Sequence, residues 1–290
     1  EENKDVHYAL IDSSFNDGNN NTVTLDNARP LLFNTAEAAY LAGYASAGMT
    51  TTGTLAVIGG ERDNVTSSQM SAFSQGVDAY NLANGTSITV LGWNPVTSDG
   101  TYAGSADEVR TATADAIAQG ADIIAPFAGK ANEGAARAVT EAAKPTVRLV
   151  WSGLTKNDLK GLTRDEAQSA ETAPMSGQSG APAVQQVDTQ SFADAFSYIQ
   201  ISDEVRSAIG APVLTGIVVD YKAAMETLIA QASAGDKASV VPVSLASGGV
   251  ILTGFGAYTP MLSSELKLGL SDMAGQIETG GMVISTPFDV

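Results

Sequence analysis

The sequence predicts an α/β protein with two lobes, each built on a mainly parallel sheet. Short β-branched runs alternate with segments of helical periodicity, which is the pattern of βαβ units. A chain of 290 residues with 44% apolar side chains is also long enough to bury two ordinary cores.

The first half of the chain alternates regularly between the two kinds of element. Strands are expected where short apolar runs end at polar or glycine residues, and helices where apolar residues recur every three to four positions. In order, we expect a strand at Val6–Ile11, a helix at Thr35–Gly48 capped by Asn34 or Thr35, a strand at Thr54–Ile58, a helix at Ser67–Asn84, a strand at Ile88–Leu91, a helix at Asp107–Gln119, a strand at Ile123–Phe127, a helix at Glu133–Ala143 and a strand at Val147–Trp151.

The second half begins with an irregular segment, Thr155–Gly210. Within it Ala173–Val184 is rich in Ala, Ser, Gly, Pro and Gln without a period, which indicates a surface loop, and Ser191–Ser207 has a helical pattern. Regularity then returns with a strand at Val213–Val219, a helix at Tyr221–Ala234, short strands at Val240–Val243 and Val250–Thr253, a helix at Ser263–Glu278 and a strand at Met282–Ser285.

Composition limits the function. The formal charge of −17 repels phosphate backbones, so we expect no nucleic-acid partner. The chain has no cysteine, which excludes thiol nucleophiles and thiolate metal sites. No apolar run approaches the roughly 20 residues that span a bilayer, and Glu1 to Asp5 are unlike a secretion signal, so we expect a processed chain.

The candidate ligand site lies at the carboxyl ends of the predicted strands, where open α/β sheets bind ligands. The tryptophans Trp93 and Trp151 both fall there, and their faces suit stacking on a base or a sugar, although they equally suit packing. Polar and glycine residues in the adjoining turns complete the expected set. The candidate ligand-binding residues are Trp93, Asn94, Tyr102, Phe127, Gly129, Asn132, Trp151 and Ser152.

Two other sequence patterns are weak indications of a functional site. The stretch Asp17–Asn21 begins like a calcium loop, but Ala28 stands where the closing glutamate is needed, so a polar turn is the preferred interpretation. His7 is the only histidine and has no acid partner nearby in sequence, which argues against a Ser-His-Asp triad. We therefore expect no enzyme, no cofactor and no metal site.

Several stretches resemble the basic-membrane-protein (purine nucleoside receptor) family. The helix Phe33–Tyr44 is similar to the family's glutamate–tyrosine–leucine–alanine–glycine helix, and Thr54–Gly60 to its next strand and glycine pair. Further stretches match in the same order: Gly76, Gly120–Ile124, Ala128-Gly129, Leu245–Val250, Ser264–Lys267 and Thr286–Val290.

The resemblance implies a two-lobed, periplasmic-binding-protein-like (type I) fold and a substrate-binding lipoprotein of an ABC importer. The expected ligand is a small polar aromatic solute, with a purine nucleoside first, and the expected partner is an ABC permease. The resemblance also implies an extracytoplasmic protein held at the membrane through a lipidated N-terminus outside this chain.

The resemblance also indicates two departures. By this resemblance, the chain is expected to begin after the family's first βα units. Asp12–Asn16 therefore matches the family's ligand-binding motif in residue types, but its position aligns with a later strand. Ser152–Thr155 stands where the family has a ribose-binding aspartate, with Asp158 the nearest acid. Loss of that charge-assisted bond removes about 1.5–3 kcal/mol of binding.

These departures leave an alternative open. In this alternative, the chain is an accessory subunit that binds no ligand, and we expect a partner chain to cover the surface left by the absent first-lobe segment. As lobe boundaries we expect 1–34 and 155–250 for lobe 1 with its insertion, 35–154 for lobe 2, and 251–290 for a segment crossing between lobes. A third option, an enzyme, would require nucleoside turnover.

Overall fold

Two parallel sheets organise the computed structural model, which describes residues 6–11, 15, 17, 23–160, 200–235, 241–284 and 286. The larger has six strands in the order β13-β11-β8-β7-β3-β4, and only β13 runs antiparallel to its neighbour. Its strands are β3 (Thr54–Gly59), β4 (Thr89–Leu91), β7 (Ile123–Phe127), β8 (Arg148–Thr155), β11 (Val213–Val219) and β13 (Val250–Leu252).

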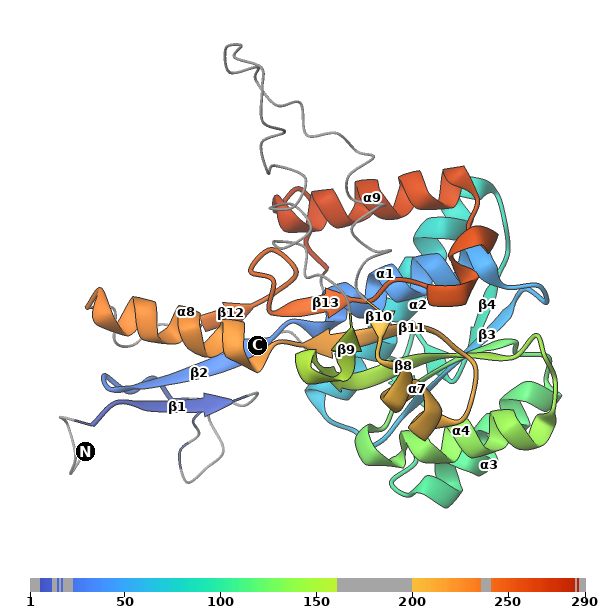
Figure 1. Ribbon diagram of the computed structural model, residues 1–290, viewed down its shortest axis with the longest axis horizontal. Helices are drawn as coiled ribbons and strands as arrows, with labels where there is room; N and C mark the ends of the chain where they lie inside the picture. Colours follow the sequence, from blue (N-terminus) through green and yellow to red (C-terminus); the bar gives the residue numbers. More distant parts are fainter. Residues whose placement is uncertain are drawn as a thin grey trace, which may run out of the picture.

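Helices cover both faces of this sheet (Figure 1). Side chains of β3 alternate between two cores: Leu55 and Val57 pack toward α1, α2 and α9, whereas Ala56 and Ile58 pack toward α3 and α4. The helices are α1 (Thr35–Met49), α2 (Asn64–Asn84), α3 (Ala106–Ala118), α4 (Asn132–Ala142), α7 (Asp203–Ile209) and α9 (Ser264–Glu278). We call this sheet with these helices the six-stranded unit.

The smaller sheet has three parallel strands in the order β1-β2-β12. They are β1 (Tyr8–Ile11), β2 (Ala28–Phe33) and β12 (Val241–Val243), and α8 (Tyr221–Ser233) packs against β12. This three-stranded unit lies to the left in Figure 1. Two short antiparallel pairs complete the described strands: β5 (Trp93–Asn94) with β6 (Asp99–Gly100), and β9 (Leu159–Lys160) with β10 (Gln200–Ile201).

The helix α1 is buried on nearly every side, as expected for a helix in the centre of a core. It lies so close to α2 that two glycines are required. A Cβ atom on Gly43 would lie 2.0 Å from the carbonyl oxygen of Phe73, and one on Gly76 would lie 2.0 Å from that of Tyr40.

The predicted α/β class is confirmed, but some elements differ. The strand β2 was not predicted, because Arg29-Pro30 resembles a turn in sequence. The strand expected at Met282–Ser285 is wrong over 282–284, since the Met282 N–H donates to Gln276 at the end of α9 instead of joining a sheet. Ser285 lies outside the described residues.

The irregular segment differs as well. The strand β8 continues through Thr155, so Ser152–Thr155 is strand and not the expected turn. The helix expected at Ser191–Ser207 is wrong over 200–202 and confirmed over 203–207, because Gln200–Ile201 is a strand and Ser202 caps the helix α7. The start of that helix and the loop expected at Ala173–Val184 lie outside the described residues.

Candidate functional site

The carboxyl ends of both sheets face the same junction. Strand β2 ends directly before α1 of the six-stranded unit, and β11 ends directly before α8 of the three-stranded unit. A third crossing, Ser244–Gly249, joins β12 to β13. Because parallel α/β sheets bind ligands beyond their carboxyl ends, this junction is the candidate site.

Trp93 and Asn94 follow β4 in a short hairpin. Trp93 is 7% exposed and belongs to the core beside α2. The Asn94 side chain is exposed, and its oxygen accepts hydrogen bonds from the N–H groups of Val96 (2.9 Å) and Thr97 (3.2 Å). Asn94 thus shapes the hairpin turn, as asparagine side chains often do.

Tyr102 stands beside the end of β3. Its backbone forms a bridge with Gly59, and its hydroxyl lies 2.8 Å from the Ser67 hydroxyl. The exposed guanidinium of Arg62 lies 5.8 Å from the ring centroid and 3.3 Å from a carboxylate oxygen of Asp99. The half-buried ring and the arginine therefore form a polar, aromatic rim on this side of the junction.

Asn132 and Ser152 form a buried network below the edge. The Asn132 amide accepts from the Ala128 N–H (2.8 Å) and donates to the Ser152 carbonyl (3.2 Å) and hydroxyl (3.1 Å). The Ser152 hydroxyl donates to the Pro126 carbonyl (2.6 Å). Both residues are at most 5% exposed, so these groups hold the turn after β7 against β8.

The other three candidates differ in exposure. Phe127 is buried and meets Phe73 edge to face at 6.3 Å. Gly129 has a φ of +55°, and a Cβ there would meet no atom within 4 Å, so the turn is open on that side. Trp151 is half-buried between two apolar clusters.

The sheet order separates the two tryptophans. Strands β7 and β3 lie between β8, which carries Trp151, and β4, which leads to Trp93. Three strand spacings are roughly 14 Å, which is too wide for both rings to stack on one base. The structure thus brings Asn132 together with Ser152, while the two indoles lie on different sides of the edge.

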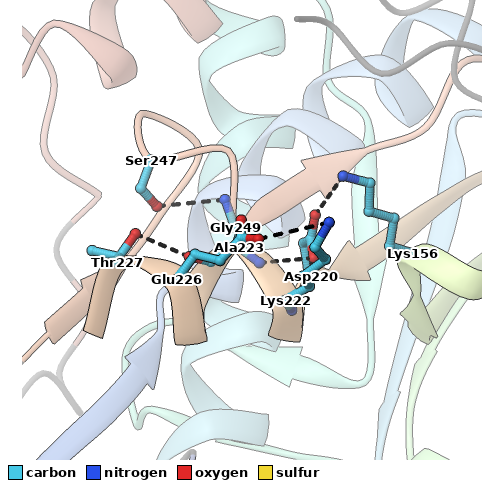
Figure 2. Close-up of polar contacts among 8 residues, drawn as sticks. All are labelled: Lys156, Asp220, Lys222, Ala223, Glu226, Thr227, Ser247 and Gly249. Carbon is cyan, nitrogen blue, oxygen red and sulfur yellow. Dashed lines mark hydrogen bonds and ion pairs between the residues drawn. The ribbon is translucent and has the colours of Figure 1, made fainter. Parts of the chain in front are cut away.

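The junction contains an ion pair that was not predicted from the sequence. The Lys156 ammonium lies 2.8 Å from one carboxylate oxygen of Asp220, whose side chain is only 3% exposed (Figure 2). The other oxygen accepts from the N–H groups of Lys222 (3.0 Å) and Ala223 (3.1 Å) at the start of α8. Asp220 directly follows a predicted strand, so the carboxyl-end rule would have found it.

Two further acids are engaged nearby. Asp158 accepts from the N–H and hydroxyl of Thr155 and so closes the turn after β8. Glu37, on the first turn of α1, accepts from the Leu245 N–H (2.8 Å) and the Asn34 amide (2.8 Å). Burial raises the pKa of Glu37 above its usual value, and the two hydrogen bonds oppose that effect.

The described part of the chain contains neither a cluster of metal ligands nor a membrane-spanning helix. Among its residues, no three His, Cys, Asp or Glu side chains gather closely enough to hold a metal ion. His7 is exposed beside β1, and of the Asp17–Asn21 stretch only Asp17 is described. None of the described helices has the length and apolarity needed to cross a bilayer.

Comparison with known proteins gives the family. A family model described as ABC transporter substrate-binding protein PnrA-like (Bmp) matches residues 1–156. Among solved structures, an ABC transporter solute-binding protein from Aeropyrum pernix K1 is similar, with 18% identity and a TM-score of 0.60 over 98% of this chain and 71% of that one.

Two further structures have the same fold. A solute-binding protein from Conexibacter woesei has 14% identity and a TM-score of 0.57, over 99% of this chain and 73% of that one. A transcriptional activator of the comK gene from Bacillus halodurans has 14% identity and a TM-score of 0.56, over 96% and 72%. No curated protein matches the sequence. With its matched first half and its periplasmic-binding-protein-like architecture, the chain belongs to the Bmp family of PnrA-like ABC transporter substrate-binding proteins.

Proposed function

We propose that the chain captures a small polar aromatic solute, with a purine nucleoside as the first candidate, and delivers it to an ABC permease. One observation carries this proposal: the carboxyl ends of two mainly parallel sheets face one junction, which the described part of the chain crosses three times. Such a junction lets two lobes close on a ligand by a hinge motion.

The ligand contacts that we propose come from the accessible candidates. Tyr102 and Trp151 offer aromatic surface, Asn94 offers an amide, and the open Gly129 turn offers backbone groups. The buried candidates have another role. We assign Asn132, Ser152, Phe127 and Trp93 to shaping the edge from below.

The lobe assignment follows the sheets. We propose that β1, β2, β12 and α8 belong to lobe 1, and that the six-stranded unit is lobe 2. This moves β11, which falls within the expected 155–250 segment, to lobe 2. We also propose an extracytoplasmic protein with a lipidated N-terminal anchor outside this chain, as the family suggests.

The second candidate function is an accessory subunit without a ligand. It is favoured by the exposed apolar residues at the edge of the smaller sheet: Val6, Tyr8 and Ile11 are each between 46% and 48% exposed. Parallel sheets normally have both faces covered. In this alternative a partner chain covers β1.

A thermal-shift titration separates the two functions. Wild-type chain is titrated with purine and pyrimidine nucleosides, free bases and sugars, and a ligand at a hundredfold excess over Kd adds about 2.7 kcal/mol to the folded state. A saturable rise that Trp151→Phe weakens and Trp93→Phe leaves in place supports capture at the carboxyl-end edge beside Trp151. No rise with any solute, together with a larger assembly in sedimentation when the partner is present, supports the accessory subunit.

A further inference from the structure

Among the described residues, three chain crossings connect the two units, and hydrogen bonds join these crossings to one another. At the first crossing, the Asn34 N–H donates to the Val243 carbonyl at 2.7 Å, which joins it to the third. At the second crossing, the Asp220 N–H donates to the Gly249 carbonyl at 2.8 Å, which again joins it to the third. The three crossings are therefore connected by hydrogen bonds into one cluster, which we call the hinge. An interaction that restrains one crossing also restrains the other two.

Asp220 is the central residue of this cluster (Figure 2). One of its oxygens holds the start of α8, which belongs to the three-stranded unit, and the other meets Lys156, which follows β8 of the six-stranded unit. The carboxylate is almost completely buried, whereas the lysine side chain is 42% exposed. A buried carboxylate paired to a cation is costly to leave without its partner, so the pair resists separation.

The position of the pair sets its mechanical effect. Asp220 follows directly on β11, whose Val219 pairs with Thr155 of β8, so its backbone stays with the six-stranded unit. A change in the angle of α8 therefore acts on the Asp220 side chain, which must give up either its hydrogen bonds to the start of α8 or its contact with Lys156. By contrast, the Lys160–Asp203 ion pair joins β9 to α7 within the six-stranded unit and is not affected by that angle.

We propose that the Lys156–Asp220 ion pair is a clamp at the hinge, which holds the two units in one relative orientation until a ligand stabilises another. This clamp rests on the proposed two-lobed capture, and it assigns Lys156 and Asp220 a positioning role without contact to the solute. Loss of the pair frees the three-stranded unit to sample a wider range of angles. The apparent affinity for a solute then changes through the population of the competent orientation.

The ion pair can be tested by site-specific spin labelling. The chain contains no cysteine, so spin labels attach only where cysteines are introduced. We would label Leu82→Cys at the end of α2 and Ile229→Cys on α8, two positions that are 89% and 59% exposed. Pulsed electron resonance on the protein without solute then reports the distance distribution between the units. We expect one narrow distribution for the otherwise wild-type chain.

Four single variants and one double variant decide the outcome. Lys156→Met and Asp220→Asn should broaden the distribution, Lys156→Arg should keep it narrow, and the Lys160→Met control should leave it unchanged. Asparagine is itself a good helix cap, so Asp220→Asn keeps the bonds to α8 and tests the charge. The double variant Lys156→Met/Asp220→Asn should be no broader than Asp220→Asn alone, since both changes remove one interaction.

The result that overturns the clamp is a distribution as narrow as wild type in both Lys156→Met and Asp220→Asn, with unchanged circular dichroism. An equal broadening in Lys160→Met also overturns it, because the effect is then not specific to the hinge. Since no solute is present, this test is independent of capture: absence of nucleoside binding overturns the proposed function and leaves the distance result standing.

Discussion

Replacement of Asn132 by alanine tests whether the predicted ligand residue is a structural one. The side chain is 1% exposed and makes three hydrogen bonds, with the Ala128 N–H and with the carbonyl and hydroxyl of Ser152. Alanine leaves the Ala128 N–H and the Ser152 carbonyl buried without this partner, at about 1–3 kcal/mol for each unsatisfied group. Because packing can relax, we expect a total loss of about 2–4 kcal/mol in the free energy of unfolding.

Urea unfolding followed by circular dichroism measures this loss. The midpoint should fall while the slope with denaturant stays constant, which identifies a change in stability and not in the denatured state. Gln119→Ala is the control, since that exposed amide donates to the Asp115 carbonyl and its loss should change stability by less than about 0.5 kcal/mol. A double-mutant cycle with Ser152→Ala should give a coupling of about 0.5–3 kcal/mol.

A loss below about 0.5 kcal/mol in Asn132→Ala would refute the reasoning, because a buried and satisfied amide must contribute more than an exposed one. A coupling energy near zero with Ser152→Ala would refute the network itself. If stability is retained but solute binding is lost, Asn132 contacts the ligand, as the sequence first suggested.

Four more predictions concern single sites. Gly76→Ala places a Cβ 2.0 Å from a backbone oxygen, so it should destabilise the chain by about 1–3 kcal/mol in urea unfolding. Gly275→Ala meets no atom within 4 Å and should instead stabilise α9 by about 0.5–1 kcal/mol. Asp122→Ala removes the buried carboxylate that accepts four hydrogen bonds from Thr50–Thr52. The free energy of unfolding in urea should therefore fall by about 2–4 kcal/mol. A smaller loss than that of the exposed Asp115→Ala would contradict this structural role of Asp122. The raised pKa of Glu37 means that its contribution to stability is present below the usual pKa of about 4.3 and is lost as pH rises through the folded pKa. Glu37→Gln should therefore gain stability relative to wild type as pH rises through that window, and a pH-independent difference would contradict this.

Much of the fold could be predicted because the signals are local. The helices α1, α2 and α9 and the strands β3, β7 and β11 follow from apolar periodicity and from residues that end each run. The strand β2 was missed because its interior carries Arg29 and Pro30, which local preference assigns to a turn. It is a strand because β1 and β12 pair with it on either side, and no local rule contains that pairing.

The candidate site stays a prediction. The carboxyl-end rule led to the edge at which the described chain crosses between the two sheets, since the rule depends only on where parallel strands stop. It did not indicate which side chains are accessible there. Asn132 and Ser152 lie in different βα units, and whether their polar groups meet each other or a ligand depends on how β7 and β8 pack.

The sequence by itself determined the α/β class, the order of most elements and the resemblance to the family, because periodicity, end signals and ordered motifs are written along the chain. Only the tertiary structure decided the order of strands in the two sheets, the burial of Trp93 and the pairing of Lys156 with Asp220. The physical reason is that ion pairs and burial depend on distances between elements far apart in the chain, and those distances exist only once the two sheets have packed.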